Sequence, residues 1–308
     1  MGGGGSSFNW DASKLKAEVR KAEDKVSDAV FDTSLSEQLS QLLSVYNSRD
    51  NSLVNERLEE IKSQIGDLVE SDVKILLGGS VAKHTYVDGF SDIDTLMILN
   101  DMDIPIKNPQ EVLSFLEGAL KARLSDTLKV EHGRLAVTVT YTDGMEIQIL
   151  PALKTENGIK VPAWKKDNGW SEIDPKAFSE KLTKVNADCG GKLIPTIKLI
   201  KAVNSTLPEE QQLSGYHIES LAIATFKGYA GPTAPAKMMS TFFEKAKDLV
   251  LTPIKDSTGH SIHVDDYLGP AQSAQREQAS HLLNRISKRI RNANASGSQE
   301  QWQQLFDA

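Results

Sequence analysis

Apolar residues recur at helical spacing through the N-terminal part of the chain. In residues 13–31 and 35–65 they stand three and four positions apart among good helix formers, which predicts long amphipathic helices. The polar stretch NSRDNS at 47–52 interrupts this pattern. It predicts either two helices or one long helix with an interruption.

From residue 73 the pattern changes to short apolar runs, which are typical of strands. Residues 73–79 (VKILLGG) and 94–99 (DTLMIL) predict two strands joined by a loop. Residues 135–141 and 145–153 predict a second pair of strands. The Asp-Gly pair between them is typical of a hairpin turn, so these two strands are expected to lie side by side.

A helix with clear start signals is predicted between the two strand pairs, over residues 108–124. Asn108 is placed as the N-cap, Pro109 occupies the first helical position, and Glu111 stands where a capping box puts an acid. The residues that follow keep the three-and-four spacing of a helix with one apolar face. This segment is therefore expected to pack on the predicted strands.

The pattern is helical again from about residue 175 onward. Helices are predicted at 192–207, 215–230, 236–251 and 275–294. We therefore predict an α+β chain with a flexible leader at 1–10, a lobe of mixed sheet and helices over 11–165, and a helical lobe over 166–308. A cleft between two such lobes is the natural place for a ligand.

Composition and charge narrow the class of protein. Of 308 residues, 39% are hydrophobic and 25% charged, as in ordinary soluble globular proteins. The net charge of −7 disfavours a grip on long nucleic acid, which needs a basic surface, and favours a small nucleotide. The single cysteine, Cys189, allows no intrachain disulfide and fits a reducing, cytoplasmic compartment. We expect no membrane span and no stable nucleic-acid partner.

Two carboxylates stand at the start of a predicted buried strand. In LGGSVAKHTYVDGFSDIDTLMILN, residues 77–100, Asp92 and Asp94 are two positions apart, so their side chains point to the same face. Like charges so close raise each other's pKa unless a cation neutralises them. Magnesium suits both carboxylates and phosphates, and two such ions can hold the attacking and leaving oxygens of a phosphoryl transfer. We predict two Mg²⁺ ions here, with Mn²⁺ as the alternative.

The loop before these carboxylates fits a phosphate ligand. Gly79 and Ser80 end the preceding predicted strand, and glycines let the backbone N–H groups approach a triphosphate closely. Either motif alone is ordinary turn composition. Their order, from strand to Gly-Gly-Ser to Asp-x-Asp to strand, favours a site for metal and nucleotide.

This order of motifs resembles the nucleotidyltransferase superfamily of DNA polymerase beta type. Within it the chain is most similar to the bacterial branch related to cyclic GMP-AMP synthase and oligoadenylate synthase, which makes cyclic oligonucleotide signals in anti-phage defence. Further segments of similarity are Leu150-Pro151-Ala152, the helix with Lys198 and Lys201, LSGYHIESL at 213–221 and PIKDSTGHSIHVDDYLG at 253–269. The resemblance implies a polymerase-beta-like lobe, a helical lobe, and an active site in the cleft between them.

The resemblance also implies a third carboxylate three residues before Pro151, where this chain has Gln148. Glu146 lies two residues earlier on the same predicted strand, hence on the same face, and its longer side chain gives it reach. We predict Asp92, Asp94 and Glu146 as the catalytic, metal-binding acids. If Gln148 is instead an inactivating substitution, the chain is a catalytically silent member.

The remaining candidates are nucleotide-binding residues. The resemblance implies that the lysine helix meets phosphates, that a tyrosine stacks on a base, and that a serine precedes this tyrosine, where the chain has Gly215. The ordinary alternatives are a solvated lysine face and core packing of the tyrosine. His260 and His263 are expected to belong to loop structure rather than to a zinc site. The predicted nucleotide-binding set is Gly79, Ser80, Lys83, Gln148, Lys198, Lys201, Ser214 and Tyr216.

The function implied is Mg-dependent joining of ATP and other NTPs into a cyclic di- or oligonucleotide second messenger. By resemblance, its partners are a product-sensing effector and a regulatory protein. The alternatives are a polymerase or tRNA-end nucleotidyltransferase acting on RNA, a silent nucleotide-binding scaffold, and a small-molecule modifier. A basic groove outside the cleft would favour the RNA enzyme, and an inert Glu146 would favour the scaffold.

Overall fold

A computed structural model of the chain describes most of its residues. The described residues are 12–48, 51–69, 73–88, 93–100, 108–155, 158–163, 169–173, 175–254 and 264–307. The helices are α1 (Ala12–Tyr46), α2 (Asn51–Val69), α3 (Gly79–Ala82), α4 (Pro109–Arg123), α5 (Pro175–Asp188), α6 (Leu193–Ser205), α7 (Gly215–Phe226), α8 (Pro235–Leu249), α9 (Ala274–Ala295) and α10 (Gln299–Gln303). The strands are β1 (Lys74–Leu77), β2 (Ile93–Asn100), β3 (Thr127–His132), β4 (Val137–Tyr141), β5 (Glu146–Thr155), β6 (Gly158–Pro162) and β7 (Trp170–Ile173).

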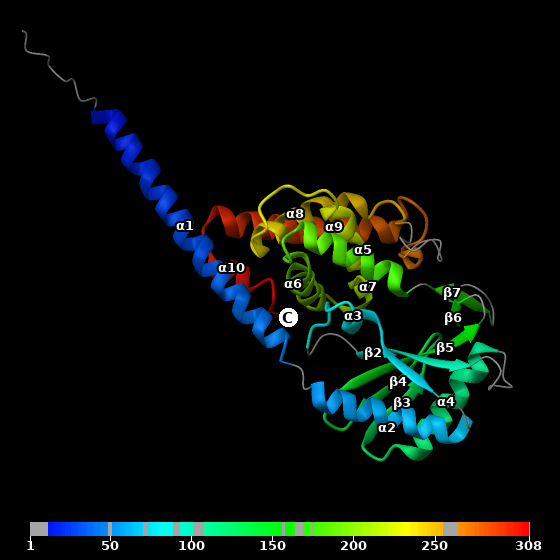
Figure 1. Cartoon of the computed structure of the whole chain (residues 1–308). Helices are drawn as coiled ribbons and strands as arrows, with labels where there is room; N and C mark the ends of the chain where they lie inside the picture. Colours follow the sequence, from blue (N-terminus) through cyan, green and yellow to red (C-terminus); the bar gives the residue numbers. More distant parts are fainter. Residues whose placement is uncertain are drawn as a thin grey trace, which may run out of the picture.

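The strands form one mixed sheet that places the carboxylate-bearing strand near its centre. The sheet order is β1-β2-β5-β4-β3, and β6 pairs with β5 and β7. Among the described pairs β2 and β5 run parallel, whereas the other pairs are antiparallel. Helices α2 and α4 lie beside the sheet (Figure 1) and share a core with it through residues such as Ile61, Leu113, Met97 and Ile149. The α+β prediction is confirmed.

Local signals in the sequence predicted several elements correctly. The break at NSRDNS separates α1 from α2. Asn108 caps α4, its side-chain oxygen accepting from the Gln110 N–H at 2.9 Å. Strands β4 and β5 form the predicted hairpin, where the Gly144 N–H donates to the Tyr141 carbonyl at 3.0 Å. Gly144 has φ 87°, a left-handed conformation that glycine adopts without strain.

The helical lobe gathers the ends of the described chain. Leu35 and Leu39 of α1 share one core with α5–α9, Trp302 of α10 and Leu305. The Gln38 side-chain amide donates to that of Gln303 at 2.7 Å, across 265 positions of sequence. Figure 1 shows α1 lying along this lobe and extending beyond it.

Two elements lie in the other lobe from the one that the predicted boundaries gave them. The division at 165/166 grouped α1 with the sheet lobe, but the apolar face of α1 packs on the helical lobe. It also grouped residues 170–173 with the helical lobe, whereas β7 continues the sheet beyond β6. The partners of α1 lie far away in the sequence, whereas the boundary at 165/166 separated β7 from its neighbouring strand β6. The predicted leader, 1–10, lies outside the described residues. None of the described helices is long and apolar enough to cross a membrane.

Candidate active site

Asp94 and the Gly-Gly-Ser turn meet where β1 and β2 lie side by side. The Gly78 N–H donates to the Asp94 carbonyl at 2.8 Å, which continues the antiparallel pairing of the two strands. Gly79 then opens the short helix α3, and the Ser80 N–H donates to Oδ2 of Asp94 at 3.2 Å. The structure therefore brings together the predicted residues Gly79, Ser80 and Asp94. The backbone of the turn orients the Asp94 carboxylate.

The Ser80 hydroxyl has no hydrogen-bond partner within the described part of the chain, although it is buried. The Ser80 carbonyl is satisfied, because it accepts from the N–H groups of Thr85 and Tyr86 at 2.9 and 3.1 Å. Buried polar groups are nearly always paired, so an unpaired hydroxyl beside Asp94 fits a site completed by a ligand.

The pairing of the strands shows where Gln148 and Glu146 lie relative to Asp94. Asp94 is paired with Gln148 across the parallel β2–β5 contact, so both side chains rise on the same face of the sheet. Glu146 lies two residues earlier on that face, opposite Thr140, whose hydroxyl donates to Oε1 of Glu146 at 3.0 Å. Gln148 thus lies beside Asp94, and Glu146 is one step further along the strand. Asp92 lies outside the described residues.

Burial raises the pKa of Asp94 above its usual value. The Ser80 N–H and the charges of Lys83 and Lys201 act against this rise, while the charge of Glu219 adds to it. The carboxylate is therefore partly deprived of water and favours a neighbouring cation.

Two lysines and a glutamate form a buried cluster next to Asp94. Lys201 of α6 donates to Oε1 of Glu219 at 2.8 Å and to the Thr85 hydroxyl at 3.3 Å. Lys83, just after α3, donates to the other oxygen of Glu219, and Thr85 also hydrogen-bonds to this carboxylate. Only 1% of the surface of Glu219 is exposed. We call Lys83, Thr85, Lys201 and Glu219 the lysine cluster.

The opposite charges of the two lysines and Glu219 stabilise one another. Burial lowers the pKa of Lys201, and the nearby Glu219 opposes this shift. Burial tends to raise the pKa of Glu219, but the two lysines outweigh it and hold that pKa below its usual value. Glu219 is therefore ionised at neutral pH.

Sequence reasoning missed Glu219 and Thr85. The signal for Glu219 was available, because it is the only acid in the otherwise apolar helix GYHIESLAIATF. An acid in such a helix is expensive to bury without a cation. Its partners, however, lie 18 and 136 positions away and could not be read from the local pattern.

The predicted lysine pair divides between two places. Lys201 is buried in the lysine cluster, whereas the Lys198 ammonium donates to the side chain of Asn47, at the end of α1. Three residues correspond to 300° of helix, so the two side chains diverge by about 60°. The structure thus places Lys201 near Asp94 and Lys198 beside α1.

Ser214 and Tyr216 lie at the start of α7. The Ser214 hydroxyl caps the helix by accepting from the His217 N–H at 3.2 Å. The half-buried Tyr216 ring lies 4.5 Å from the ring of Phe178, centroid to centroid, and the Lys83 ammonium lies 5.0 Å from the Tyr216 centroid. Tyr216 and Lys83, both predicted to bind nucleotide, are therefore neighbours.

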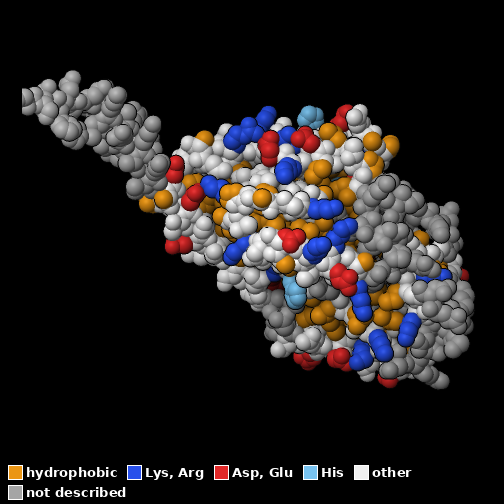
Figure 2. Space-filling model, turned by 45° about the horizontal axis from the view of Figure 1, so that its top comes forward, with side chains coloured by type: hydrophobic (Ala, Val, Ile, Leu, Met, Phe, Trp, Pro, Cys, Tyr) orange, Lys and Arg blue, Asp and Glu red, His pale blue; other side chains and the backbone are white. Residues whose placement is uncertain are grey.

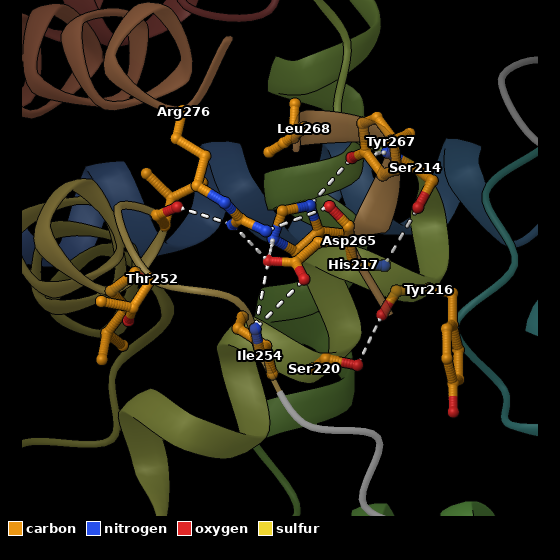
Figure 3. Close-up of polar contacts among 12 residues, drawn as sticks. Ser214, Tyr216, His217, Ser220, Thr252, Ile254, Asp265, Tyr267, Leu268 and Arg276 are labelled. Atoms are coloured by element: carbon orange, nitrogen blue, oxygen red, sulfur yellow. Dashed lines mark hydrogen bonds and ion pairs between the residues drawn. The ribbon is translucent and has the colours of Figure 1, made fainter. Parts of the chain in front are cut away.

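A second group of polar side chains, most of them buried, contacts the start of α7 (Figure 3). The Ser214 N–H donates to the Tyr267 hydroxyl at 3.2 Å, and the same hydroxyl is hydrogen-bonded to Nδ1 of His217, 2.8 Å away. Nε2 of His217 lies 3.5 Å from Oδ2 of Asp265, which accepts from Arg276 at 2.7 Å. Burial, as the main cause, lowers the pKa of His217 to about 4, so this histidine is neutral at pH 7. We call His217, Asp265, Tyr267 and Arg276 the histidine cluster.

The residues around Asp94 suit magnesium in their chemistry. The side chains on this face of β2 and β5 offer carboxylate and amide oxygens, which are the ligands that magnesium prefers. The buried, unpaired Ser80 hydroxyl beside Asp94 agrees with a site completed from outside the protein. Within the described residues, no group of three or more His, Cys, Asp or Glu side chains could hold a metal ion.

Comparison with known families decides where the chain belongs. The model of the Second Messenger Oligonucleotide or Dinucleotide Synthetase domain matches residues 33–186, which is half of the chain. The chain is a member of this synthetase family. The predicted resemblance is thereby confirmed. The matched segment contains Ser80, Asp94 and Glu146 but ends before the helices with Lys201 and Glu219.

Individual relatives agree with this synthetase family. A cyclic GMP-AMP synthase of Escherichia albertii is 26% identical over 179 residues, which are 55% of this chain and 40% of that protein. The match therefore spans less than half the length of that curated relative.

Solved structures share the fold at low identity. CdnG of Bradyrhizobium diazoefficiens, solved with GTP, has a TM-score of 0.65 at 15% identity, covering 86% of this chain and 92% of that one. CdnC of E. coli MS115-1, solved with ATP, has a TM-score of 0.63 at 15% identity, covering 91% and 93%. DncV of Vibrio cholerae, a cyclic AMP-GMP synthase, has a TM-score of 0.62 at 12% identity, covering 95% and 90%. The two-lobe fold of this synthetase-family chain is thus the fold of these proteins.

Proposed function

We propose that the chain is a magnesium-dependent nucleotidyltransferase that joins NTPs into a cyclic di- or oligonucleotide second messenger. One observation carries the proposal: the Ser80 N–H of the Gly-Gly-Ser turn orients the Asp94 carboxylate, and two buried lysines lie close by. A carboxylate that favours a cation, next to ammonium groups that favour phosphate, is the arrangement that transfer of a nucleotidyl group needs.

We assign one role in this reaction to each of several described residues. The Ser80 hydroxyl and the ammonium groups of Lys83 and Lys201 hold the triphosphate of a donor nucleotide. The half-buried ring of Tyr216 stacks on a base, since every base offers a π face. The hydroxyl of a second nucleotide forms a bond to the α-phosphorus, pyrophosphate leaves, and a second transfer of the same kind closes the ring.

Asp92, Asp94 and Glu146 are the residues that would hold magnesium. When bound there, magnesium neutralises charge on the phosphates and makes the attacking hydroxyl more acidic. Asp94 is kept in place by the Ser80 N–H. Glu146 lies on the same face of the sheet by strand alternation, and its carboxylate accepts from the Thr140 hydroxyl of β4.

The solved relatives support a proposal for the biological setting. The solved CdnC of E. coli MS115-1 also forms a complex with a HORMA protein. We propose a regulatory protein of this kind and a product-sensing effector as partners, within cytoplasmic anti-phage defence. On the face shown in Figure 2, the described Lys and Arg side chains lie in small groups over both lobes with Asp and Glu between them. The net charge of −7 favours free NTPs over a long RNA as substrates.

The test is to incubate the purified chain with Mg²⁺ and all four NTPs and to identify the products by chromatography and mass spectrometry. The Asp92→Ala/Asp94→Ala double variant should make none, and Asp248→Ala, which removes an exposed carboxylate of α8, should behave as wild type. A phosphatase-resistant cyclic product made only by wild type and the control supports the proposal. Linear tails on added RNA would replace it with the RNA-transferase alternative.

A silent nucleotide-binding scaffold is the second candidate, because Gln148 stands beside Asp94 in the sheet. Glu146→Gln distinguishes the two. In an active enzyme this change should raise the Mg²⁺ concentration needed for half-maximal turnover by about tenfold, because one metal-binding charge is lost. Binding of ATP without turnover in wild type, both with and without a regulatory partner, would favour the scaffold.

A further inference from the structure

Glu219 is a buried carboxylate for which the proposed reaction has no direct use. Its two oxygens face two different ammonium groups: Oε1 lies 2.8 Å from Nζ of Lys201, and Oε2 contacts Lys83. These lysines come from opposite sides of the site. Lys201 belongs to the helical lobe, and Lys83 follows the Gly-Gly-Ser turn of the sheet lobe. Glu219 is therefore the group that brings the two cations together.

The charges of the cluster do not cancel. Lys83 and Lys201 carry two positive charges, and Glu219 returns one negative charge. The remaining positive charge faces Asp94, whose carboxylate balances it when ionised and not bound to a metal. Two of the three N–H donors of the Lys201 ammonium group bind Glu219 and Thr85. The cluster is thus built to keep two lysines charged in a buried place, with capacity left for an anion.

Gly215 supplies the space in which the Lys201 ammonium lies. A Cβ atom at this position would lie 3.3 Å from Nζ and 3.4 Å from Cε of Lys201, closer than such contacts normally are. Its φ angle is not in the left-handed region, so the backbone does not require glycine here. A side chain here would instead push the Lys201 head away from the first turn of α7 by a few tenths of an ångström.

The lysine heads are also held from the side of the predicted base site. The Lys83 ammonium lies 4.8 Å from the ring centroid of Phe178 and 5.0 Å from that of Tyr216. Cations in such positions are attracted by the ring faces. Lys83 is therefore placed between the aromatic pair and Glu219, and both of its neighbours limit its movement.

We propose that Glu219 is a positioning residue that holds Lys83 and Lys201 together as a two-ammonium seat for the triphosphate of the donor nucleotide, with Gly215 leaving room for Lys201. This inference rests on the proposed nucleotide-binding function and adds to it. Glu219 itself does not touch the reacting atoms. It sets the distance and the charge of the groups that do.

The experiment measures nucleotide affinity and turnover separately. Binding of a non-hydrolysable ATP analogue with Mg²⁺ is followed by calorimetry, and KM and kcat for NTPs are measured by product formation. Glu219→Gln keeps the shape and removes the charge, and Gly215→Ala adds one methyl group and changes no charge. Glu244→Gln is the matched control, because this α8 carboxylate also pairs with a cation, Arg291, but at the surface of the helical lobe.

Glu219→Gln is expected to raise Kd and KM by about tenfold or more, since a charge-assisted contact is lost on both lysines, with kcat within about threefold of wild type. Gly215→Ala is expected to raise KM by about threefold to tenfold without lowering Tm, because alanine favours a helix more than glycine does. The control should leave all three quantities unchanged. If Glu219→Gln does not fold, Gly215→Ala alone decides the question.

The outcomes separate this inference from the proposed function. If wild type binds the analogue and the folded variants bind it equally well, the positioning role is wrong and the proposed function stands. A fall in kcat with unchanged KM would also contradict the role, because it would place Glu219 in the chemical step. If wild type itself binds no nucleotide, both proposals fail.

Discussion

The two buried charge clusters on either side of the start of α7 differ in their balance. In the histidine cluster, Arg276 and Asp265 cancel, His217 is neutral, and Arg276 also donates to the carbonyls of Gly269, Val250 and Asp265. In the lysine cluster, two cations face one carboxylate. Each cluster borders one buried polar atom without a partner among the described residues, Nε2 of His217 in the first and the Ser80 hydroxyl near the second, so the two differ in charge rather than in unpaired groups. We therefore expect the balanced cluster to hold the fold together and the one with an additional cation to serve an anionic ligand.

The largest expected effect comes from the acid next to the lysine cluster. Asp94→Asn should reduce kcat by roughly 10³-fold, equivalent to about 4 kcal/mol, because the negative charge that would hold magnesium at the transferring phosphate is lost. Tm should not fall, since burial already disfavours the ionised form of Asp94. Single-turnover kinetics and thermal unfolding check the two parts. A large loss of Tm would mean that Asp94 belongs to the structural kind of cluster.

The histidine cluster should show the opposite behaviour. Arg276→Met should lower the free energy of unfolding by about 3–5 kcal/mol, because Asp265 would remain buried without its cation. Nucleotide affinity of the molecules that still fold should change little. Denaturant titration measures the first quantity and calorimetry with an ATP analogue the second. Unchanged stability would contradict the structural role of Arg276.

Acid should weaken the histidine cluster before it weakens the rest of the protein. His217 has a pKa of about 4 in the folded chain and an ordinary value of 6.5 when unfolded, so the unfolded state binds more protons between these values. The free energy of unfolding should therefore fall as pH is lowered from 6.5 to 4, by up to about 3 kcal/mol from this residue.

The comparison that isolates this effect is wild type against His217→Gln, unfolded by denaturant at several pH values. Tyr267, Asp265 and Arg276 face His217 and are common to both proteins. The difference between the two curves should flatten below pH 4. Parallel curves from pH 4 to 6.5 would mean that His217 is not buried as a neutral ring.

A smaller change tests the link from the histidine cluster to the start of α7. Tyr267→Phe removes the hydroxyl that accepts from the Ser214 N–H and is hydrogen-bonded to His217, which should cost about 1 kcal/mol of stability. Tyr229→Phe is the matched control, because its hydroxyl donates only to the Pro232 carbonyl in a surface turn. Equal losses in the two variants would show that the Tyr267 hydroxyl has no special part.

What could be predicted from sequence was local. Asn108 and the Asp-Gly turn act within a few residues, so the start of α4 and the β4–β5 hairpin were predicted correctly. Strand alternation also placed Glu146 and Gln148 on one face. Glu219 could not be assigned a role, because its partners come from the turn after β1 and from α6. The prediction that Asp92, Asp94 and Glu146 share a metal stays a prediction.

The contact between the Gln38 and Gln303 side chains joins early and late parts of the chain, so the helical lobe is completed later in synthesis than the sheet lobe. The sheet lobe has all of its described strands once residue 173 has been made. The helical lobe lacks the buried Trp302 and Leu305 until synthesis has passed 265 positions beyond Gln38. During synthesis the apolar face of α1 is therefore still uncovered when the strands of the sheet lobe are complete. A nascent chain has the Asp94 strand in place well before α6 and α7 supply Lys201 and Glu219, so the proposed nucleotide site cannot be complete until both helices have been made.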